Sequence, residues 1–148
     1  MRQPAGSVGT MTAVPSDFDH LMPFATACGI RFERVAPDEV VTTMEWAADR
    51  CTTSGMVHGG ALMTLADTAG AVCAFLNLPP GAGTSTIESK TNFFRALREG
   101  RAVATTRPLH VGRTTVVVQT DVHDDAGRRL AQTTQTQAVL APTAEPSS

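Results

Sequence analysis

The segment from His58 to Asp67 combines two groups that could act on a carbonyl compound. The pair Gly59-Gly60 opens a stretch with helical character, and Asp67 follows among small and apolar side chains. Backbone N–H groups at a helix N-terminus have no partner within the helix, so they can hold an anion or polarise a carbonyl. Glycine at this place lets a ligand approach the backbone closely. A carbonyl binder and a lone carboxylate together suit the hydrolysis of an activated acyl group.

The spacing of these two groups predicts that they work in different copies of the chain. Gly59 and Asp67 are eight residues apart, which corresponds to about 12 Å along a helix. At about 100° per residue they also point about 80° apart. One reacting carbon can hardly lie within about 3 Å of both groups on the same helix. We therefore expect a dimer in which each site is shared between two chains.

Composition narrows the class of protein. A chain of 148 residues is long enough for one domain with a proper core. The formal net charge of −2 and the lack of a long basic run disfavour nucleic-acid binding. We expect no membrane span, because no stretch of about 20 apolar residues occurs, and the N-terminus lacks the apolar core of a signal peptide. Three scattered cysteines, Cys28, Cys51 and Cys73, fit a reduced, cytoplasmic protein.

Helices and strands must position Gly59 and Asp67, and hydrophobic periodicity and turn residues predict where these helices and strands lie. Both ends of the chain are rich in small, polar and Pro residues, so we expect a flexible segment over 1–14, a single domain over 15–141 and a disordered tail over 142–148. A short helix is predicted from 15 to 27 and a long one from 55 to 76, which stops before Pro79. Strand patterns cover, in chain order, residues 30–35, 40–46, 84–94, 102–111, 114–123 and 130–140.

One long helix among antiparallel strands is an α+β architecture. The turn at Pro37-Asp38 and the turn over 124–127 join strands that are adjacent in the chain. The long helix is apolar nearly all round, with Leu62, Leu65 and Val72 on one side and Met63 and Ala71 elsewhere. We therefore expect a sheet wrapped around it.

Three stretches give the chain a family resemblance. They are GMVHGGALMTLADTAGA, then TIESKTNFFRALREG, then GRTTVVVQTDVHDDAGRRLAQ. Over residues 28–140 the pattern resembles the PaaI-like branch of the hotdog-fold acyl-CoA thioesterases. The resemblance implies a long central helix wrapped by a curved antiparallel sheet of five to six strands. It also implies homodimers, paired into homotetramers, with acyl-CoA bound in the subunit interface and with neither a metal nor a cofactor.

The resemblance also assigns roles to single residues. Gly59 matches the glycine whose N–H polarises the thioester carbonyl, and Gly60 joins it in the substrate site. Asp67 matches the acidic residue that attacks the carbonyl or activates water, and His58 matches the histidine beside the glycine. Relatives often carry Asn or Gln six residues before that histidine, where this chain has Thr52. Threonine offers one donor where an amide offers two, so the orientation of a water is in question.

Two further segments enter through the resemblance. Thr86 matches a Ser or Thr that some relatives place near the attacking water. The turn Gly112-Arg113-Thr114 matches the segment that approaches the nucleotide phosphates, a role that Lys90, Arg95 and Arg98 could also fill. Apolar residues at five positions are expected in the core or in the lining of an acyl pocket: Met22, Phe24, Met63, Phe93 and Phe94.

Other chemistries fit the sequence less well. A helical zinc site is excluded because Leu62 stands four residues after His58, and no HExxH or CxxC pair is present. The chain has no GxSxG elbow, and the Gly-rich stretch 81–84 follows a helix and precedes a strand, the reverse of a dinucleotide loop. Cys51 paired with His58, and Glu88, stay open as weaker alternatives for catalysis.

Two alternative functions share the fold and the ligand. An enoyl-CoA hydratase of this fold carries a paired Asp and His five residues apart, but here Leu62 and Val72 stand at that spacing from Asp67. A non-catalytic acyl-CoA-binding protein would keep the pocket without turnover, an alternative that Thr52 leaves open.

Overall fold

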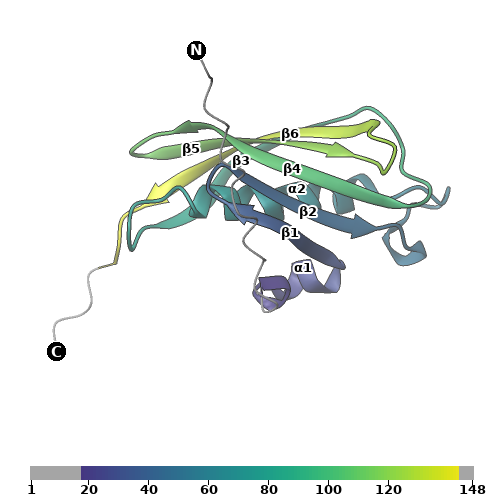
Figure 1. Cartoon of the computed structure of the whole chain (residues 1–148), viewed down its shortest axis with the longest axis horizontal. Coiled ribbons are helices and arrows are strands. Elements are labelled where there is room, and N and C mark those ends of the chain that lie inside the picture. The colour runs from purple at the N-terminus through teal and green to yellow at the C-terminus, as the bar shows by residue number, and fades with distance from the viewer. Residues whose placement is uncertain (1–17, 144–148) are drawn as a thin grey trace, which may run out of the picture.

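The computed structural model describes residues 18–143, which form an antiparallel sheet curved around one long helix (Figure 1). The strands are β1 (Ile30–Ala36), β2 (Glu39–Glu45), β3 (Gly83–Phe93), β4 (Arg101–Val111), β5 (Thr115–His123) and β6 (Arg129–Leu140). They lie in the order β1-β2-β4-β5-β6-β3 in a 6-stranded sheet. The long helix α2 (Gly59–Phe75) packs against every strand. The expected α+β class and the hotdog fold are confirmed.

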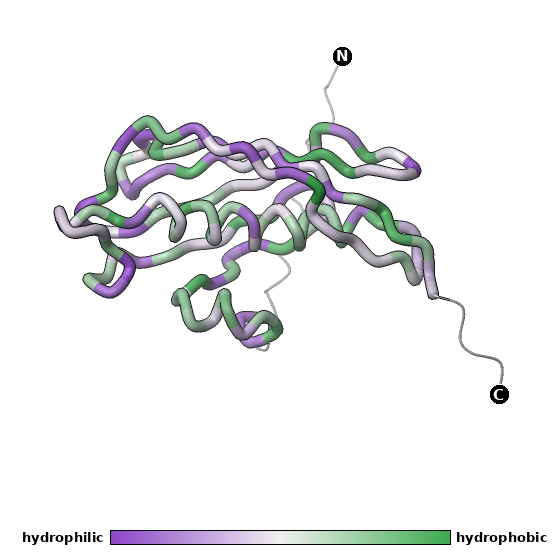
Figure 2. The backbone as a smooth tube through the Cα atoms, turned by 180° about the vertical axis from the view of Figure 1, so that it is seen from behind, coloured by the Kyte–Doolittle hydropathy of each residue, from purple (hydrophilic) through white to green (hydrophobic). Residues whose placement is uncertain are grey.

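Alternating side chains of the strands build the core beneath the sheet. Along β5, Val116, Val118 and Val122 are buried, whereas the residues on the other face of the strand stay partly exposed. Figure 2 shows the same mixture of polar and apolar residues along the strands. The buried residues Ala66 and Ala69 of α2 are small, so the sheet can approach the helix closely.

One side of α2 is left uncovered by the described chain. Met63 is 39 % exposed and Phe75 is 60 % exposed, and Asp67 between them is exposed as well. Met63 and Asp67 are one turn apart and therefore neighbours on the helix surface. Large apolar side chains exposed beside a carboxylate indicate a surface that contacts something else.

The long helix begins at Gly59, four residues later than its sequence pattern predicts. Before it, Cys51 and Val57 pair as an isolated β-bridge. The Val57 N–H donates to the Leu97 carbonyl at 2.9 Å, and the His58 N–H donates to the Arg50 carbonyl at 2.8 Å. The carbonyls that an earlier helical turn would need accept other donors: Met56 accepts the Thr52 N–H at 2.8 Å, and Gly55 accepts Nε1 of Trp46 at 3.0 Å.

The predicted helix over 15–27 is two shorter pieces. A 3-10 helix covers Phe18–His20, and α1 covers Pro23–Ala27, with Pro23 in the first turn where its missing N–H is tolerated. Residues 15–17, the expected flexible segment 1–14 and residues 144–148 of the expected tail lie outside the described residues. Within residues 18–143, no helix is both long and apolar enough to cross a membrane.

Strand β3 forms one edge of the sheet, and among the described residues it pairs with β6 alone. Most of its side chains are exposed, including Ile87 at 62 % and Phe93 at 50 %. A register shift between Thr86 and Glu88 leaves Ile87 as a bulge. A long exposed edge of this kind offers free backbone groups for pairing with another strand.

Candidate active site

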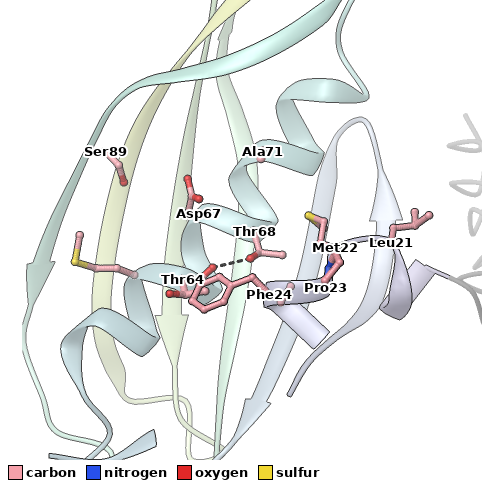
Figure 3. Close-up of a pocket in the computed structure, with 11 residues that line it drawn as sticks. Leu21, Met22, Pro23, Phe24, Thr64, Asp67, Thr68, Ala71 and Ser89 are labelled. Carbon is pink, nitrogen blue, oxygen red and sulfur yellow. Dashed lines mark hydrogen bonds between the residues drawn. The ribbon is translucent and has the colours of Figure 1, made fainter. Parts of the chain in front are cut away.

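Asp67 lies on the uncovered side of α2 and lines a cavity of about 550 Å³ between α1, α2 and β3. Figure 3 shows its carboxylate between Ser89 of β3 and the residues Pro23 and Phe24 of α1. Most of the lining is apolar and comes from the two helices and the residues before α1: Leu21, Met22, Pro23, Phe24, Ala25, Met63 and Ala71. A carboxylate at the wall of an apolar cavity of this size suits an acyl ligand.

A buried amide holds the Asp67 carboxylate. Nε2 of Gln135, on β6, donates to Oδ1 of Asp67 and also to Oγ1 of Thr86, the latter at 3.3 Å. Nε2 of Gln137 donates to the same Thr86 oxygen at 2.8 Å. Gln135 and Gln137 are each 1 % exposed. The structure thus brings Thr86 into the surroundings of Asp67, with Gln135 as the link between them.

The N-terminus of α2 is arranged by His58. Its backbone is extended, with φ −62° and ψ 135°, and its Nδ1 accepts the Gly60 N–H at 2.8 Å. This is the side-chain capping expected at the residue before a helix. Within residues 18–143 the neighbouring Gly59 N–H has no hydrogen-bond acceptor. His58 therefore takes up the Gly60 donor and leaves the Gly59 donor available.

Gly59 opens onto a second cavity, of about 300 Å³. Its lining includes Thr52, Phe93, Phe94 and Arg95. A Cβ at Gly59 would lie 3.1 Å from Cζ of Phe93, tighter than most side chains allow. Glycine therefore keeps this part of the helix end open to a ligand.

A single chain does not unite Gly59 with Asp67. The cavity beside Asp67 and the cavity beside Gly59 share no lining residue. His58 and Gly60 line a third cavity, of about 390 Å³, which shares Phe24 and Thr64 with the Asp67 cavity. The acidic group and the free helix-end donor thus face different spaces within one protomer.

The turn Gly112-Arg113-Thr114 lies far from Gly59. It joins β4 to β5 and is closed by the Gly112 N–H, which donates to the Thr115 carbonyl at 2.9 Å. Thr115 pairs with the end of β6 that also pairs with Gly83. The turn is therefore at the Gly83 end of β3, whereas Gly59 contacts Phe93 at the other end, about 30 Å away along the strand.

The alternative cations differ in their surroundings. Arg95 is exposed beside the Gly59 cavity. Arg98 donates to the Ser54 carbonyl at 3.0 Å, and Lys90 donates to Oδ1 of Asn92 at 2.6 Å. Glu88 is exposed on β3.

No hydrogen bond joins a cysteine thiol to His58 within residues 18–143. Cys51 and His58 line the same cavity, but the Cys51 thiol donates to the Ala47 carbonyl at 3.2 Å. Burial, aided by the charge of Asp38, raises the pKa of the Cys73 thiol to about 11, so this thiol stays protonated at neutral pH. Among the described residues, no cluster of three or more His, Cys, Asp and Glu could hold a metal ion.

Gln135 and Gln137 are the site residues that sequence reasoning missed. The sequence signal for these residues is a run of polar side chains at alternate positions of a strand. Thr133, Gln135 and Gln137 of β6 occupy the positions that face inward, and all three are buried. Buried polar side chains are normally satisfied by specific partners. The partners are 68 and 49 residues away for Gln135, so the pattern alone does not name them.

Comparison with known proteins agrees with this architecture. Residues 54–131 match the family described as Thioesterase superfamily. The chain is 32 % identical over 111 residues to 1,4-dihydroxy-2-naphthoyl-CoA hydrolase of Escherichia coli (strain K12), covering 75 % of this chain and 82 % of that protein. It is 29 % identical over 136 residues to the proofreading thioesterase EntH of Cronobacter sakazakii, covering 92 % of this chain and 90 % of that protein.

Solved structures show the same fold. A mutant of the phenylacetic acid degradation protein PaaI from Thermus thermophilus superposes with a TM-score of 0.74 at 30 % identity. The match covers 80 % of this chain and 100 % of that chain.

Proposed function

The chain belongs to the thioesterase superfamily, and from this membership we propose that it hydrolyses an aryl-acyl-CoA or medium-chain acyl-CoA to the free acid and CoA. It is a hotdog-fold thioester hydrolase, and the acyl class is the part that we propose. The supporting observation is the apolar cavity of about 550 Å³ with a single carboxylate, Asp67, in its lining. Phe24, Met22 and Met63 give this space the character of an acyl or aryl pocket.

Asp67 acts on the thioester carbonyl, either as the nucleophile or as the general base for water. In both routes a new C–O bond forms at the carbonyl carbon, the C–S bond breaks, and CoA leaves as a thiolate. A thiolate is a weak base compared with an alkoxide or an amide ion, so the route requires no strong general acid.

Gly59 and His58 act on the carbonyl oxygen. The Gly59 N–H stands at the positive end of α2 and has no acceptor within residues 18–143, so it can bind the oxygen as negative charge develops. His58 orients this end of the helix through its bond with the Gly60 N–H. Thr52 lines the Gly59 cavity and stands at the position where relatives often carry Asn or Gln.

We propose that each active site is shared between two chains. The separate cavities of Gly59 and Asp67 support this arrangement, and so does the uncovered side of α2 with Met63 and Phe75. The free edge of β3 provides the surface for pairing. Antiparallel pairing of two β3 strands would turn the two helices against each other and bring Asp67 of the partner subunit toward Gly59.

The same pairing suits the expected phosphate contacts. It would lay the Gly83 end of one β3 beside the Phe93 end of the other. Arg113 of the partner subunit, with Gly112 and Thr114, would then stand at the end of the molecule that carries Gly59. A guanidinium there can bind the phosphate oxygens of CoA. Two dimers of this kind would form the tetramer that the resemblance implies.

Replacement of Asp67 by Asn tests the chemistry. We expect Asp67→Asn to fold, to bind acyl-CoA and to lose several orders of magnitude in kcat, because a general base contributes roughly 10²- to 10⁴-fold and a nucleophile more. The measurement is CoA-thiol release from a panel of aryl-acyl and straight-chain acyl-CoAs. Near wild-type turnover of the best substrate by Asp67→Asn would show that another residue does the chemistry.

The same panel separates the alternative functions. A non-catalytic acyl-CoA binder would bind without releasing thiol in any assay. A hydratase would consume the double bond of an enoyl-CoA and leave the thioester intact. Either outcome for the wild-type chain would replace the proposed hydrolysis.

A further inference from the structure

We propose that Gln135 is a positioning residue that fixes which oxygen of Asp67 reacts. The proposal rests on the function proposed above and adds a residue to it. Its amide Nε2 donates to Oδ1 of Asp67 from the sheet side of the helix. Oδ2 of the same carboxylate is then the oxygen left to act on the thioester or on water.

The orientation of the Gln135 amide follows from its neighbours. The acceptors of its donor end are the Asp67 carboxylate oxygen and the Thr86 hydroxyl oxygen. Turning the amide by half a circle would set its carbonyl oxygen against a carboxylate, and neither atom could donate. Nitrogen toward Asp67 is therefore the assignment that satisfies the site.

The carbonyl oxygen of the Gln135 amide is in an unfavourable environment. Oε1 of Gln135 is buried, and within residues 18–143 it has no hydrogen-bond partner. It lies against Gly70 of α2, where a Cβ would collide with it. A buried acceptor without a partner destabilises the fold, so its retention next to a carboxylate indicates a role for the donor end.

A second glutamine completes the arrangement around Thr86. Oε1 of Gln137 lies 3.2 Å from the Thr84 hydroxyl, whose single proton also has the Ala138 carbonyl at 2.9 Å, and Nε2 of Gln137 donates to Thr86. The Thr86 oxygen thus accepts from two amides, which occupies both of its lone pairs. The proton of the Thr86 hydroxyl is then left for another acceptor. A ligand atom that accepts from Thr86 and gives a proton to Oδ2 of Asp67, as a water molecule does, would suit the two residues that Gln135 joins.

The experiment replaces Gln135 by methionine, which has similar length and no N–H. We expect Gln135→Met to lower kcat about tenfold to a hundredfold, the effect of one hydrogen bond to a charged group, with little change in KM. Gln132 is the matched control, because its Nε2 donates to Oδ1 of Asp121 at 2.9 Å on the opposite face of the same strand. Gln132→Met should keep the kcat of the wild type.

A second measurement does not depend on turnover. The side-chain amide signals of Gln135 in ¹H–¹⁵N spectra, assigned by their loss in Gln135→Met, should shift and exchange faster with water in Asp67→Ala. The signals of Gln132 should stay in place. If Gln135→Met does not fold, the comparison of wild type with Asp67→Ala, with the signals assigned through the backbone, decides alone.

The possible results separate the two proposals. Unchanged kcat in folded Gln135→Met, or unmoved Gln135 signals in Asp67→Ala, overturns the positioning role and leaves the hydrolase in place. Absence of thiol release by the wild type from every thioester overturns the proposed function, and the spectra then still test the contact.

Discussion

At the scale of single residues, the site depends on polar groups that face inward from β6. Thr133 and Gln135 are each 1 % exposed, and Gln137 is buried in the same row. Thr133 shares a hydrogen bond of 2.8 Å with Thr91 of β3, and Gln135 binds Asp67 and Thr86. Burial of such groups is unfavourable unless they find partners. The row of partners links the edge strand to the helix at the point where Asp67 lies.

Arg113 is expected to act on the nucleotide and not on the chemistry. Arg113→Ala should raise KM for the full acyl-CoA substantially, because an exposed guanidinium at this turn would lose its phosphate contact. KM for a truncated thioester without the nucleotide should change little, and the salt dependence of binding should flatten. The measurement is steady-state kinetics with both substrates at several ionic strengths.

Arg95 provides the comparison for that prediction. It is exposed beside the Gly59 cavity at the other end of β3. A larger rise in KM for the full substrate in Arg95→Ala than in Arg113→Ala would move the phosphate contact to this arginine. Equal rises for full and truncated substrates in Arg113→Ala would instead give Arg113 a role in the fold.

Asp67 and Gly59 could be proposed as site residues from the sequence because each is an unusual residue type for its position. A carboxylate in an apolar helix and a glycine pair at a helix start are local features, readable within ten residues. Gln135 could not be identified in this way, because its hydrogen bond to Asp67 joins residues that are 68 positions apart in the chain. Such contacts depend on how strands register in space, which local patterns do not specify.

At the scale of elements, α2 is adapted to the groups beneath it. Glycine inside a helix is less favourable than alanine by about 1 kcal/mol, so Gly70 needs a reason to be there. The reason is the Gln135 amide, which occupies the space of a Cβ, with Cγ2 of Val118 also only 3.3 Å from that position.

The sign of one substitution tests this explanation. Helix propensity alone predicts that Gly70→Ala stabilises the protein. The collision with Gln135 predicts a loss of about 1–3 kcal/mol, as found for overpacked cores. Urea unfolding of both proteins measures the difference, and a gain in stability would show that the amide can move aside without cost.

The β5–β6 turn depends on Asp124. Its Oδ1 accepts the N–H groups of Ala126 at 3.0 Å and Arg128 at 2.9 Å, and Oδ2 accepts Nε of Arg128 at 2.7 Å. Burial alone would raise the pKa of this carboxyl, but these bonds and the arginine charge outweigh it and lower the pKa below its usual value of 3.8.

Stability should therefore depend on pH through Asp124. A carboxyl whose folded pKa is lowered stabilises the fold above the unfolded pKa of about 3.8, and the effect is lost as pH falls through the folded pKa. We expect Asp124→Asn to be less stable than wild type at pH 7, with a gap that closes below about pH 4. Urea unfolding across this range measures the gap, and one that does not change with pH would contradict the assignment.

The elements themselves were largely predictable. Strand alternation and turn residues indicated all six strands within a few residues, although the side chains of β3 are mostly exposed and do not bury one face as those of β5 do. The start of α2 was wrong by four residues, because the bonds of Val57 to Leu97 and of His58 to Arg50 hold residues 55–58 outside the helix. Local periodicity does not contain such distant partners.

At the scale of the whole molecule, a shared site predicts complementation. Asp67→Asn and Gly59→Val should each be inactive alone, the second because a side chain would collide with Phe93 and fill the helix end. Mixed under conditions of subunit exchange, they should regain activity, since each heterodimer would own one site built from two intact halves. Thiol release reports activity, and native mass spectrometry confirms exchange.

The outcome against the shared site is equally clear. Confirmed heterodimers without any recovered turnover would mean that each chain holds a complete site of its own. Thermal unfolding of both variants serves as the control for folding.

The open edge of β3 has a further consequence for how this protein behaves in dilute solution. A strand of 11 residues with unpaired backbone groups and with exposed Ile87 and Phe93 is prone to pair with other chains as long as nothing covers it. If two copies pair at this edge as proposed, substitutions that separate them should therefore yield precipitate or filaments in place of well-behaved monomers. For the same reason, the melting temperature should rise with protein concentration. Assembly would then serve solubility as well as catalysis, and the lifetime of a newly made chain would depend on how soon it meets a second copy.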